Sequence, residues 1–265
     1  MICIDLTSTD PCINLATEEY LLRNSEEDYF LTGINDRSVI IGKHQVAHRE
    51  ADTKFVTLNK IPVVRRISGG GAVYHDKGNI NFSFIVRSAP GKQVDFRKYT
   101  TPVINFLFDE GINANLEGKS DLKINGYKIS GNAEHVFRER VLHHGTILFD
   151  ADIASLKNSL RKDRSCYLTR AVDSNPSDVM NLREITSKFS CSLELKERLF
   201  NFFIRQDGNK TASLTGEEIA QIRSLADSKY RTWEWNYAYG PEYEYAGRFE
   251  TRSSGCSCRI FVKNG

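Results

Sequence analysis

The sequence predicts an α+β fold, in which strands and helices share one domain without a regular β-α-β alternation. Stretches with a two-residue apolar period, typical of strands, are mixed with stretches of the 3.6-residue period typical of helices, in no strict order. The 265 residues are 40% apolar and 26% charged and include six prolines. Such a chain is long enough to bury a core and too apolar to be disordered or of low complexity.

The first half of the chain is expected to be rich in short strands. Clean alternation of apolar and polar side chains marks the strands, and Asp10-Pro11 is a typical helix start. The expected elements are a strand at 2–6, a helix from Asp10-Pro11 with Ile13, Ala16, Tyr20 and Leu21 on one face, strands at 29–34 and 38–41 around a turn at 35–36, a helix at 49–60, strands at 61–66 and 80–86, and a helix at 99–108.

The second half is expected to begin with a hairpin and to continue mainly as helix. Asn125-Gly126 is the strongest short hairpin-turn dipeptide and lies inside the segment 122–129. Thr215 and Glu218 form a capping box, which opens a helix with Ile219, Ile222 and Ala226 on one face. A strand at 141–149 and helices at 153–160 and 193–204 complete the expected elements.

Charge and apolar patterning exclude several classes of function. Thirty-six Lys and Arg residues against 34 Asp and Glu residues leave a formal net charge of +2, so no global field attracts nucleic acid or an acidic membrane. Apolar runs such as 82–86 are far shorter than the roughly 20 residues of a membrane-spanning helix. No secretory signal is visible at the start, and six cysteines are too sparse for a disulfide scaffold. We expect a cytoplasmic protein with no nucleic-acid or membrane partner that binds anions at a local site.

The strongest local motif is the glycine-rich segment 65–76, Arg-Arg-Ile-Ser-Gly-Gly-Gly-Ala-Val-Tyr-His-Asp. Three consecutive glycines let backbone N–H groups approach a ligand closely, and Arg65 and Arg66 suit two-pronged binding of carboxylate or phosphate. The segment lacks the Lys-Ser or Lys-Thr of a P-loop and the directly following helix of a dinucleotide-binding fingerprint. It predicts an anion cradle, and a flexible hairpin tip with two solvated arginines is the alternative.

Two further segments carry polar residues within strand-like sequence. Lys128 precedes the small residues Ser130-Gly131-Asn132-Ala133, which leave its charge unobstructed, although a solvated lysine on an edge strand is the alternative. His143 and His144 are adjacent and therefore point to opposite faces of a strand, so they cannot easily bind one metal ion. We expect at least one of these histidines to lie beneath the glycine-rich segment and to form a hydrogen bond there.

Together these segments resemble the lipoate-protein ligase A family of the biotin/lipoate A/B protein ligase superfamily. The resemblance rests on R-R-x-S-G-G-G-A-V-x-H-D, then D-L with N-G-x-K-x-S-G-x-A, then H-H-G-T, and it extends to residues 13–19, 39–45 and 233–236. It implies a mixed β-sheet with helices packed on it. Residues 1–240 are then expected to form the catalytic domain, and residues 241–265 the start of a truncated C-terminal accessory domain.

The resemblance implies a ligase that works in two steps. Lipoate first joins the α-phosphate of ATP, which releases pyrophosphate and leaves lipoyl-AMP. The ε-amine of a lysine on a lipoyl acceptor domain then attacks the acyl carbon, AMP leaves, and an amide remains. The implied cofactors are ATP and Mg²⁺, and the implied acceptors are the E2 subunits of 2-oxoacid dehydrogenases and the glycine cleavage H protein.

The resemblance also assigns roles to individual residues of this sequence. Lys128 is the expected catalytic residue, which bridges the lipoate carboxylate and the α-phosphate. Asp121 is expected either to hold Mg²⁺ through oxygen or to pair with Lys123 or Lys128. The residues expected to bind ATP and lipoyl-AMP are Arg66, Ser68, Gly71, Ala72, Val73, Tyr74, His75 and Lys128, and those expected to line the lipoate pocket are Gly69 and Gly70.

One loop departs from the family pattern and keeps two alternatives open. The family usually carries S-V-R-S-R-V-T-N, whereas residues 174–181 read Ser-Asn-Pro-Ser-Asp-Val-Met-Asn, with Pro176 and Asp178 in place of two arginines. Each lost charge-assisted hydrogen bond costs about 1.5–3 kcal/mol, so we expect weaker nucleotide binding. A lipoyltransferase that uses preformed lipoyl-AMP and a non-catalytic lipoate or nucleotide sensor are therefore the alternatives.

A third alternative is octanoyl transfer through a thioester on an active-site cysteine. That chemistry needs a thiol beside the glycine-rich segment. No cysteine lies between Cys12 and Cys166, so the sequence favours the ligase over this transferase.

Overall fold

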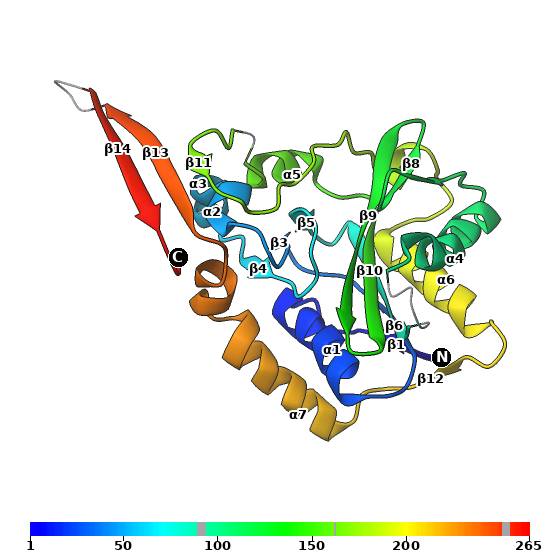
Figure 1. The fold of residues 1–265 in the computed structure, drawn as a ribbon. Coiled ribbons are helices and arrows are strands. Elements are labelled where there is room, and N and C mark those ends of the chain that lie inside the picture. The colour runs from blue at the N-terminus through cyan, green and yellow to red at the C-terminus, as the bar shows by residue number, and fades with distance from the viewer. Residues whose placement is uncertain (89–93, 162, 251–254) are drawn as a thin grey trace.

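The computed structural model describes residues 1–88, 94–161, 163–250 and 255–265, and its largest element is a mixed sheet of eight strands (Figure 1). The strand order is β12-β1-β2-β6-β10-β9-β8-β7. β1 runs parallel to β2 and β12, and the other neighbours are antiparallel, which confirms the expected α+β class. The strands are β1 (Ile2–Asp5), β2 (Tyr29–Gly33), β6 (Asn79–Arg87), β7 (Asn115–Glu117), β8 (Asp121–Ile124), β9 (Tyr127–Phe137), β10 (Arg140–Leu148) and β12 (Lys210–Thr211).

A second, three-stranded sheet carries the glycine-rich segment. Its central strand, β3 (Ser38–Ile41), pairs in parallel with β4 (Val63–Arg65) and antiparallel with β5 (Val73–His75). The glycine-rich segment therefore joins the two outer strands of this sheet. The expected strands at 29–34 and 38–41 both form, but they belong to different sheets, so residues 35–36 carry the chain from one sheet to the other.

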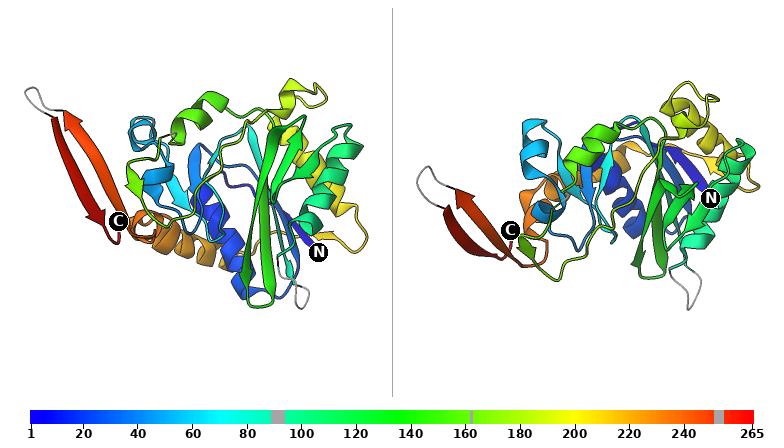
Figure 2. Two further views of the ribbon diagram at one scale, coloured as in Figure 1. Left: turned by 45° about the horizontal axis from the view of Figure 1, so that its top comes forward. Right: turned by 90° about the horizontal axis from the view of Figure 1, so that it is seen from above.

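Helices cover the outer faces of both sheets, and the helix α1 lies between the two sheets (Figures 1 and 2). α4 and α6 pack on one face of the large sheet, and α1 packs on the opposite face beside α7. The smaller sheet is covered by three short helices. The helices are α1 (Pro11–Asn24), α2 (Ala47–Glu50), α3 (Thr53–Leu58), α4 (Phe96–Asp109), α5 (Ile153–Ser159), α6 (Ser192–Ile204) and α7 (Gly216–Leu225), with the single turns η1 (Leu182–Glu184), η2 (Ala226–Tyr230) and η3 (Glu234–Ala238).

The apolar face of α1 differs from the expected one. Ala16 and Leu21 are buried as expected, but Ile13 and Tyr20 are only partly buried, and Leu22 is buried instead. The reason is that α1 contacts the large sheet, α7 and η2 at once, so it has more than one buried face. A single amphipathic stripe describes a helix at the surface and not one enclosed by several neighbours.

Two further helix predictions are corrected by local geometry. The expected helix at 49–60 is two short helices, because Ala51 is extended and Asp52 caps a new helix by accepting the N–H of Phe55. In α7, Ile222 is buried but Ile219 is exposed.

Within the described residues, no helix is long and apolar enough to span a bilayer.

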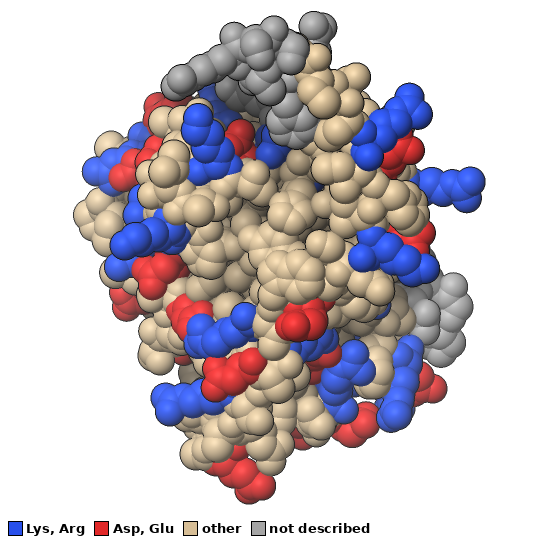
Figure 3. Space-filling view, turned by 90° about the vertical axis from the view of Figure 1, so that its left-hand side faces the viewer, with Lys and Arg blue, Asp and Glu red and all other residues tan. Residues whose placement is uncertain are grey.

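A β-hairpin near the C-terminus extends away from the body (Figure 2). Its strands are β13 (Tyr243–Glu250) and β14 (Gly255–Val262), and β13 also pairs with the two-residue strand β11 (Tyr167–Leu168). Both of its long strands fall within residues 241–265, the segment that the resemblance assigns to an accessory domain. On the face shown in Figure 3, basic and acidic side chains alternate and no region carries one sign of charge alone.

Candidate active site

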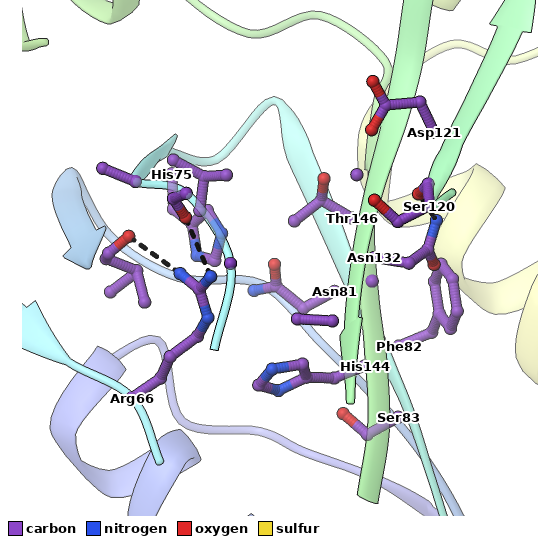
Figure 4. Close-up of a pocket in the computed structure, with 18 of the residues that line it drawn as sticks. Arg66, His75, Asn81, Phe82, Ser83, Ser120, Asp121, Asn132, His144 and Thr146 are labelled. Carbon is purple, nitrogen blue, oxygen red and sulfur yellow. Dashed lines mark hydrogen bonds between the residues drawn. The ribbon is translucent and has the colours of Figure 1, made fainter. Parts of the chain in front are cut away.

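A cavity of about 630 Å³ lies between the two sheets (Figure 4). Its volume suits a small organic molecule. α1, β2 and β3 contribute the apolar side chains Leu15, Leu31 and Ile40 to its wall, together with polar side chains such as Glu18, and β8 and β9 contribute Asp121 and Lys128. The cavity therefore offers both apolar and charged side chains to one ligand.

The Arg66 guanidinium braces the glycine-rich segment. Its Nη2 donates to the carbonyl oxygens of Gly69 at 2.6 Å and Gly71 at 2.8 Å, and its Nε donates to Ser68 Oγ at 2.9 Å. Burial lowers the pKa of Arg66 to about 10, so the group stays charged at neutral pH. Gly70 has φ +85°, a conformation that favours glycine. The arginine thus holds the loop in shape from inside the protein.

Arg65 has a structural role that the sequence did not reveal. It is fully buried, and its guanidinium donates to the carbonyl oxygens of Gly42, Lys43, Gln45, Trp235 and Asn236. The expectation that both arginines bind an anion is wrong for this residue, because its donors already have protein partners. The alternative of two solvated arginines is wrong as well, since Arg65 and Arg66 are both buried.

His144 links the glycine-rich segment to α1. Its Nε2 lies 2.6 Å from Ser68 Oγ, and its Nδ1 lies 2.9 Å from Glu18 Oε2, while Glu18 Oε1 accepts the Ser83 hydroxyl. The expected hydrogen bond beneath the glycine-rich segment is therefore confirmed. His143 points to the other face of β10, where its Nδ1 lies 2.8 Å from Glu134, as the alternation of strand side chains predicts.

Lys128 forms an ion pair with Asp121 at the charged end of the cavity. The Lys128 Nζ lies 2.9 Å from Asp121 Oδ1, and both side chains are about one-fifth exposed. Gly131 makes room for the lysine, because a Cβ on this glycine would lie 3.0 Å from Lys128 Cε and Nζ. Of the two pairings expected for Asp121, the structure has the one with Lys128, whereas Lys123 lies 3.7 Å from Glu117.

The other expected binding residues fall into two groups. Gly70, Gly71, Ala72, Val73 and His75 line the cavity together with Arg66 and Lys128. Ser68 is fully buried, the Tyr74 side chain packs among apolar residues of the smaller sheet, and neither they nor Gly69 are part of the cavity wall.

The loop that departs from the family pattern is docked on the glycine-rich segment through Ser174. Its Oγ accepts the N–H of Ala72 at 2.7 Å and Gln45 Nε2 at 3.0 Å, and donates to a carboxylate oxygen of Glu50 at 2.6 Å. Burial raises the pKa of the Glu50 carboxyl. Arg164 donates to the Ser174 carbonyl at 2.9 Å, so an arginine from outside the loop helps to hold it.

The same loop is also attached to β9, the strand that carries Lys128. The N–H of Lys128 donates to the Asp178 carbonyl at 2.8 Å, and the Lys128 carbonyl accepts the N–H of Met180 at 3.1 Å. Residues 172–175 line the cavity. The loop is therefore fixed at the glycine-rich segment and at Lys128, although the two arginines of the family pattern are absent.

Several residues of the site were missed by sequence reasoning. Asn81 lies in the cavity wall, and both atoms of its amide are buried without a hydrogen-bond partner (Figure 4). The only signal was its polar position in the alternation of β6. Glu18, Asn35, Gln45 and Ser174 lie in segments that the sequence analysis did mark, but nothing singled them out individually, because their partners are distant in the sequence.

The described part of the cavity has neither a preformed metal-binding cluster nor a thiol in its wall. Among the described residues, no cluster of three or more His, Cys, Asp or Glu side chains is arranged to hold a metal ion. None of the residues lining the cavity is a cysteine. The Cys12 thiol is buried, and burial raises its pKa to about 11, which disfavours the reactive thiolate.

The sequence of this chain is similar to that of one protein family and of several characterised relatives. The family model described as the lipoyl protein ligase A/B catalytic domain matches residues 10–204. Lipoate–protein ligase 1 of Staphylococcus aureus is 36% identical over 259 residues, which cover 97% of this chain and 79% of that protein. Lipoate-protein ligase LplJ of Bacillus subtilis is 38% identical over 239 residues, which cover 88% of this chain and 72% of that protein.

Solved structures with a fold similar to this chain include lipoate protein ligases. A putative lipoate protein ligase of Thermoplasma acidophilum with bound lipoic acid has a TM-score of 0.75 and 28% identity, and covers 89% of this chain and 98% of its own. A lipoate-protein ligase A bound with ATP has a TM-score of 0.74 and 28% identity, over 89% and 97%. A bipartite lipoate protein ligase of T. acidophilum, described with its E2 lipoyl domain, has a TM-score of 0.76 and 27% identity, over 89% and 95%.

Proposed function

Because the chain belongs to the lipoyl protein ligase A/B family, we propose that it activates lipoate with ATP and transfers the lipoyl group to a lysine of an acceptor protein. The observation that carries this proposal is one cavity that joins the apolar side chains of Leu15, Leu31 and Ile40 to the Lys128 ammonium and to the glycine-rich segment. The names of the relatives and the lipoate and ATP bound to similar structures support the same reaction.

In the first step, an oxygen of the lipoate carboxylate attacks the α-phosphorus of ATP. A P–O bond forms to lipoate, the P–O bond to pyrophosphate breaks, and pyrophosphate leaves with its electron pair. Two anions must approach each other, which fixed positive charge favours. Lys128 can supply that charge when it exchanges Asp121 for the substrate oxygens, because the ammonium is partly exposed and points into the cavity.

In the second step, the ε-amine of the acceptor lysine attacks the acyl carbon of lipoyl-AMP. The C–N bond forms, the C–O bond to AMP breaks, and the amine gives up one proton as the amide forms. AMP is a good leaving group, so the protein needs only to hold the acyl phosphate and admit the amine. Lys128 neutralises the departing phosphate, and the glycine-rich segment holds the nucleotide.

The rest of the cavity fits the remaining parts of lipoyl-AMP. Leu15, Leu31 and Ile40 provide apolar surface for the lipoyl tail. Transfer of the tail from water to this surface favours binding. Mg²⁺ commonly binds through one or two carboxylates together with substrate phosphates, where it neutralises phosphate charge. Asp121 can serve as that carboxylate, provided that it releases Lys128.

The acceptor that we propose is a lipoyl domain, such as that of a 2-oxoacid dehydrogenase E2 subunit or the glycine cleavage H protein, in the cytoplasm. The E2 lipoyl domain described with the T. acidophilum ligase supports this class of partner. A second candidate is a lipoyltransferase that uses preformed lipoyl-AMP. It is favoured by Pro176 and Asp178, which stand where the family pattern has arginines.

The test is the intact mass of a purified lipoyl domain after incubation with the protein, lipoate, ATP and Mg²⁺, beside a reaction with preformed lipoyl-AMP. A lipoyl mass increase in both reactions is the expected result, and an increase with lipoyl-AMP alone would identify a transferase. Lys128→Ala should abolish both while the thermal unfolding temperature stays near that of the wild type, because the side chain is partly exposed. No modification in either wild-type reaction would contradict the proposal and favour a sensor.

A further inference from the structure

Two lysines lie opposite each other on neighbouring strands of the cavity wall. Lys123 of β8 and Lys128 of β9 are register partners, and both line the cavity. A β-bulge produces this pairing, because the register shifts between Leu122 and Lys123. Without the shift, Lys123 would be opposite Ile129, which is fully buried in the core. Bulges re-aim side chains beside active sites, and this one places two ammonium groups on the same wall.

Stability does not explain this pair of lysines. Like charges directly opposite each other on adjacent strands are destabilising. Asp121 compensates Lys128 at 2.9 Å, but the Lys123 Nζ lies 3.7 Å from Glu117 Oε2, which is too long for a hydrogen bond. The Glu117 side chain is also 45% exposed, so water screens its attraction for Lys123. An anion bound in the cavity would remove the repulsion between the two lysines.

The other cations of the described cavity wall already have partners in the protein. All three nitrogens of the Arg66 guanidinium donate to protein oxygens. The Lys119 Nζ lies 5.7 Å from the ring centroid of Phe96, at the start of α4. Lys123 therefore stands beside Lys128 as a second cation that a ligand in the cavity can engage.

The loop next to Lys128 lacks a charge that the family pattern places there. Asp178 occupies the position of an arginine, and its carbonyl accepts the N–H of Lys128 at 2.8 Å. The Lys128 carbonyl accepts the N–H of Met180, so both backbone groups of Lys128 point to the loop and β8 lies on its other side. An arginine at 178 and a lysine at 123 would therefore flank Lys128 from opposite sides. This chain has the cation on the sheet and an anion on the loop.

We propose that Lys123 binds the β- and γ-phosphates of ATP and so replaces an arginine that the family pattern places in the loop. The inference rests on the proposed function, because these phosphates take part only in its first step. Lys128 is assigned to the α-phosphate, and a cation on the next strand meets the phosphates that follow it. Lysine binds phosphate as a point charge, and here it neutralises pyrophosphate as that group leaves.

Lys123→Met tests the inference, because methionine keeps an unbranched stem and removes the charge. The control is Lys157→Met, which removes the same charge from an exposed lysine of α5 that is not part of the cavity wall. Titration calorimetry would give the Kd of α,β-methylene-ATP with Mg²⁺ and the Kd of a lipoyl-sulfamoyl adenosine, which has no β- or γ-phosphate.

The expected result is a loss of affinity for one of the two ligands. In Lys123→Met, the Kd of α,β-methylene-ATP should rise roughly tenfold or more, which is the loss expected for one charge-assisted contact. The Kd of lipoyl-sulfamoyl adenosine should stay near the wild-type value. Both Kd values should be unchanged in Lys157→Met. Equal losses for the two ligands, an unchanged Kd of α,β-methylene-ATP, or the same loss in Lys157→Met would overturn the inference.

Asp178→Arg tests whether the two positions exchange their roles. Asp178 is exposed, so the substitution leaves the packing intact. The double variant Lys123→Met/Asp178→Arg should recover most of the affinity for α,β-methylene-ATP that Lys123→Met loses. Asp178→Arg alone should change the Kd less than it does in the Lys123→Met background, which is the coupling expected of two groups that serve one ligand. A double variant that binds no better than Lys123→Met would overturn the exchange.

The two half-reactions give an independent readout. Lys123→Met should lower kcat/KM for ATP in lipoyl transfer from lipoate and leave transfer from preformed lipoyl-AMP at the wild-type rate. Its thermal unfolding temperature should equal or exceed that of the wild type, because the like-charge pair is gone. Equal losses in both half-reactions would contradict the role of Lys123. Absence of ligation by the wild type would contradict the proposed function alone, because the two Kd values would still test Lys123.

Discussion

A methyl group at Gly71 would test whether the docked Ser174 loop forms part of the nucleotide site. An ideal Cβ at Gly71 would lie 2.9 Å from Ser174 Oγ, 3.0 Å from its Cα and 3.1 Å from its Cβ. One of these atoms is backbone, so a side-chain rotation alone cannot relieve the contact. Gly71→Ala must therefore push the loop away from the glycine-rich segment by several tenths of an ångström.

The energetic cost follows from what Ser174 holds. Its Oγ makes hydrogen bonds of 2.7 Å with Ala72, 3.0 Å with Gln45 and 2.6 Å with Glu50. Overpacking lowers the free energy of unfolding by about 1–3 kcal/mol, and the loss from weakening these hydrogen bonds falls within the same range. For a chain of this size, each kcal/mol lowers the unfolding temperature by about 2–4 °C. We expect Gly71→Ala to unfold a few degrees below wild type and to have a raised KM for ATP.

The assay compares Gly71→Ala with Gly216→Ala, which is the same chemical change at a site where a Cβ would meet no atom within 4 Å. Thermal unfolding and ATP-dependent lipoyl transfer would be measured for both variants. The KM for ATP should rise severalfold in Gly71→Ala and stay at the wild-type value in Gly216→Ala. Identical unfolding temperatures and identical KM values for the two variants would refute the reasoning.

Two further predictions concern the buried charges around the glycine-rich segment. Arg65→Met should lower the free energy of unfolding by about 3–5 kcal/mol, because buried carbonyl groups lose their partner; urea denaturation measures this, and a raised KM for ATP at unchanged stability would contradict it. Burial raises the pKa of Glu50 in the folded state above its unfolded value of about 4.3. The unfolded state therefore loses this proton first, and the free energy of unfolding falls as the pH rises from the unfolded to the folded pKa. Glu50→Gln should therefore become more stable relative to wild type as the pH rises from 4 to 7 in urea titrations, and a constant difference would speak against this account.

The elements with local signals were predictable from the sequence, and those that depend on distant partners were not. The Asn125-Gly126 turn, the Thr215 cap and the alternation of β6 act within a few residues, and each formed where expected. The helix expected at 49–60 was broken by the Asp52 cap. Whether Arg65 was solvated or buried depended on Asn236, which lies 171 positions away.

The candidate site shows the same division. The glycine-rich segment was identified from its own residues and Lys128 from the family resemblance, and Lys128 and part of the segment line the cavity. Glu18 and Asn35 were missed, because each has a role only through a histidine on another element. A single polar residue in a helix or a connection carries no local signal of such a partner.

The hydrogen bond between Ser68 and His144 acts as a spacer between two sheets. Ser68 belongs to the loop of the smaller sheet and His144 to β10 of the larger one, and their side chains meet at 2.6 Å. Apolar packing tolerates sliding, whereas a hydrogen bond weakens steeply when its length or angle changes. This contact therefore helps to fix the distance between the two sheets, and a change at Ser68, which is not part of the cavity wall, is a way to alter the width of the cavity without altering a residue that lines it.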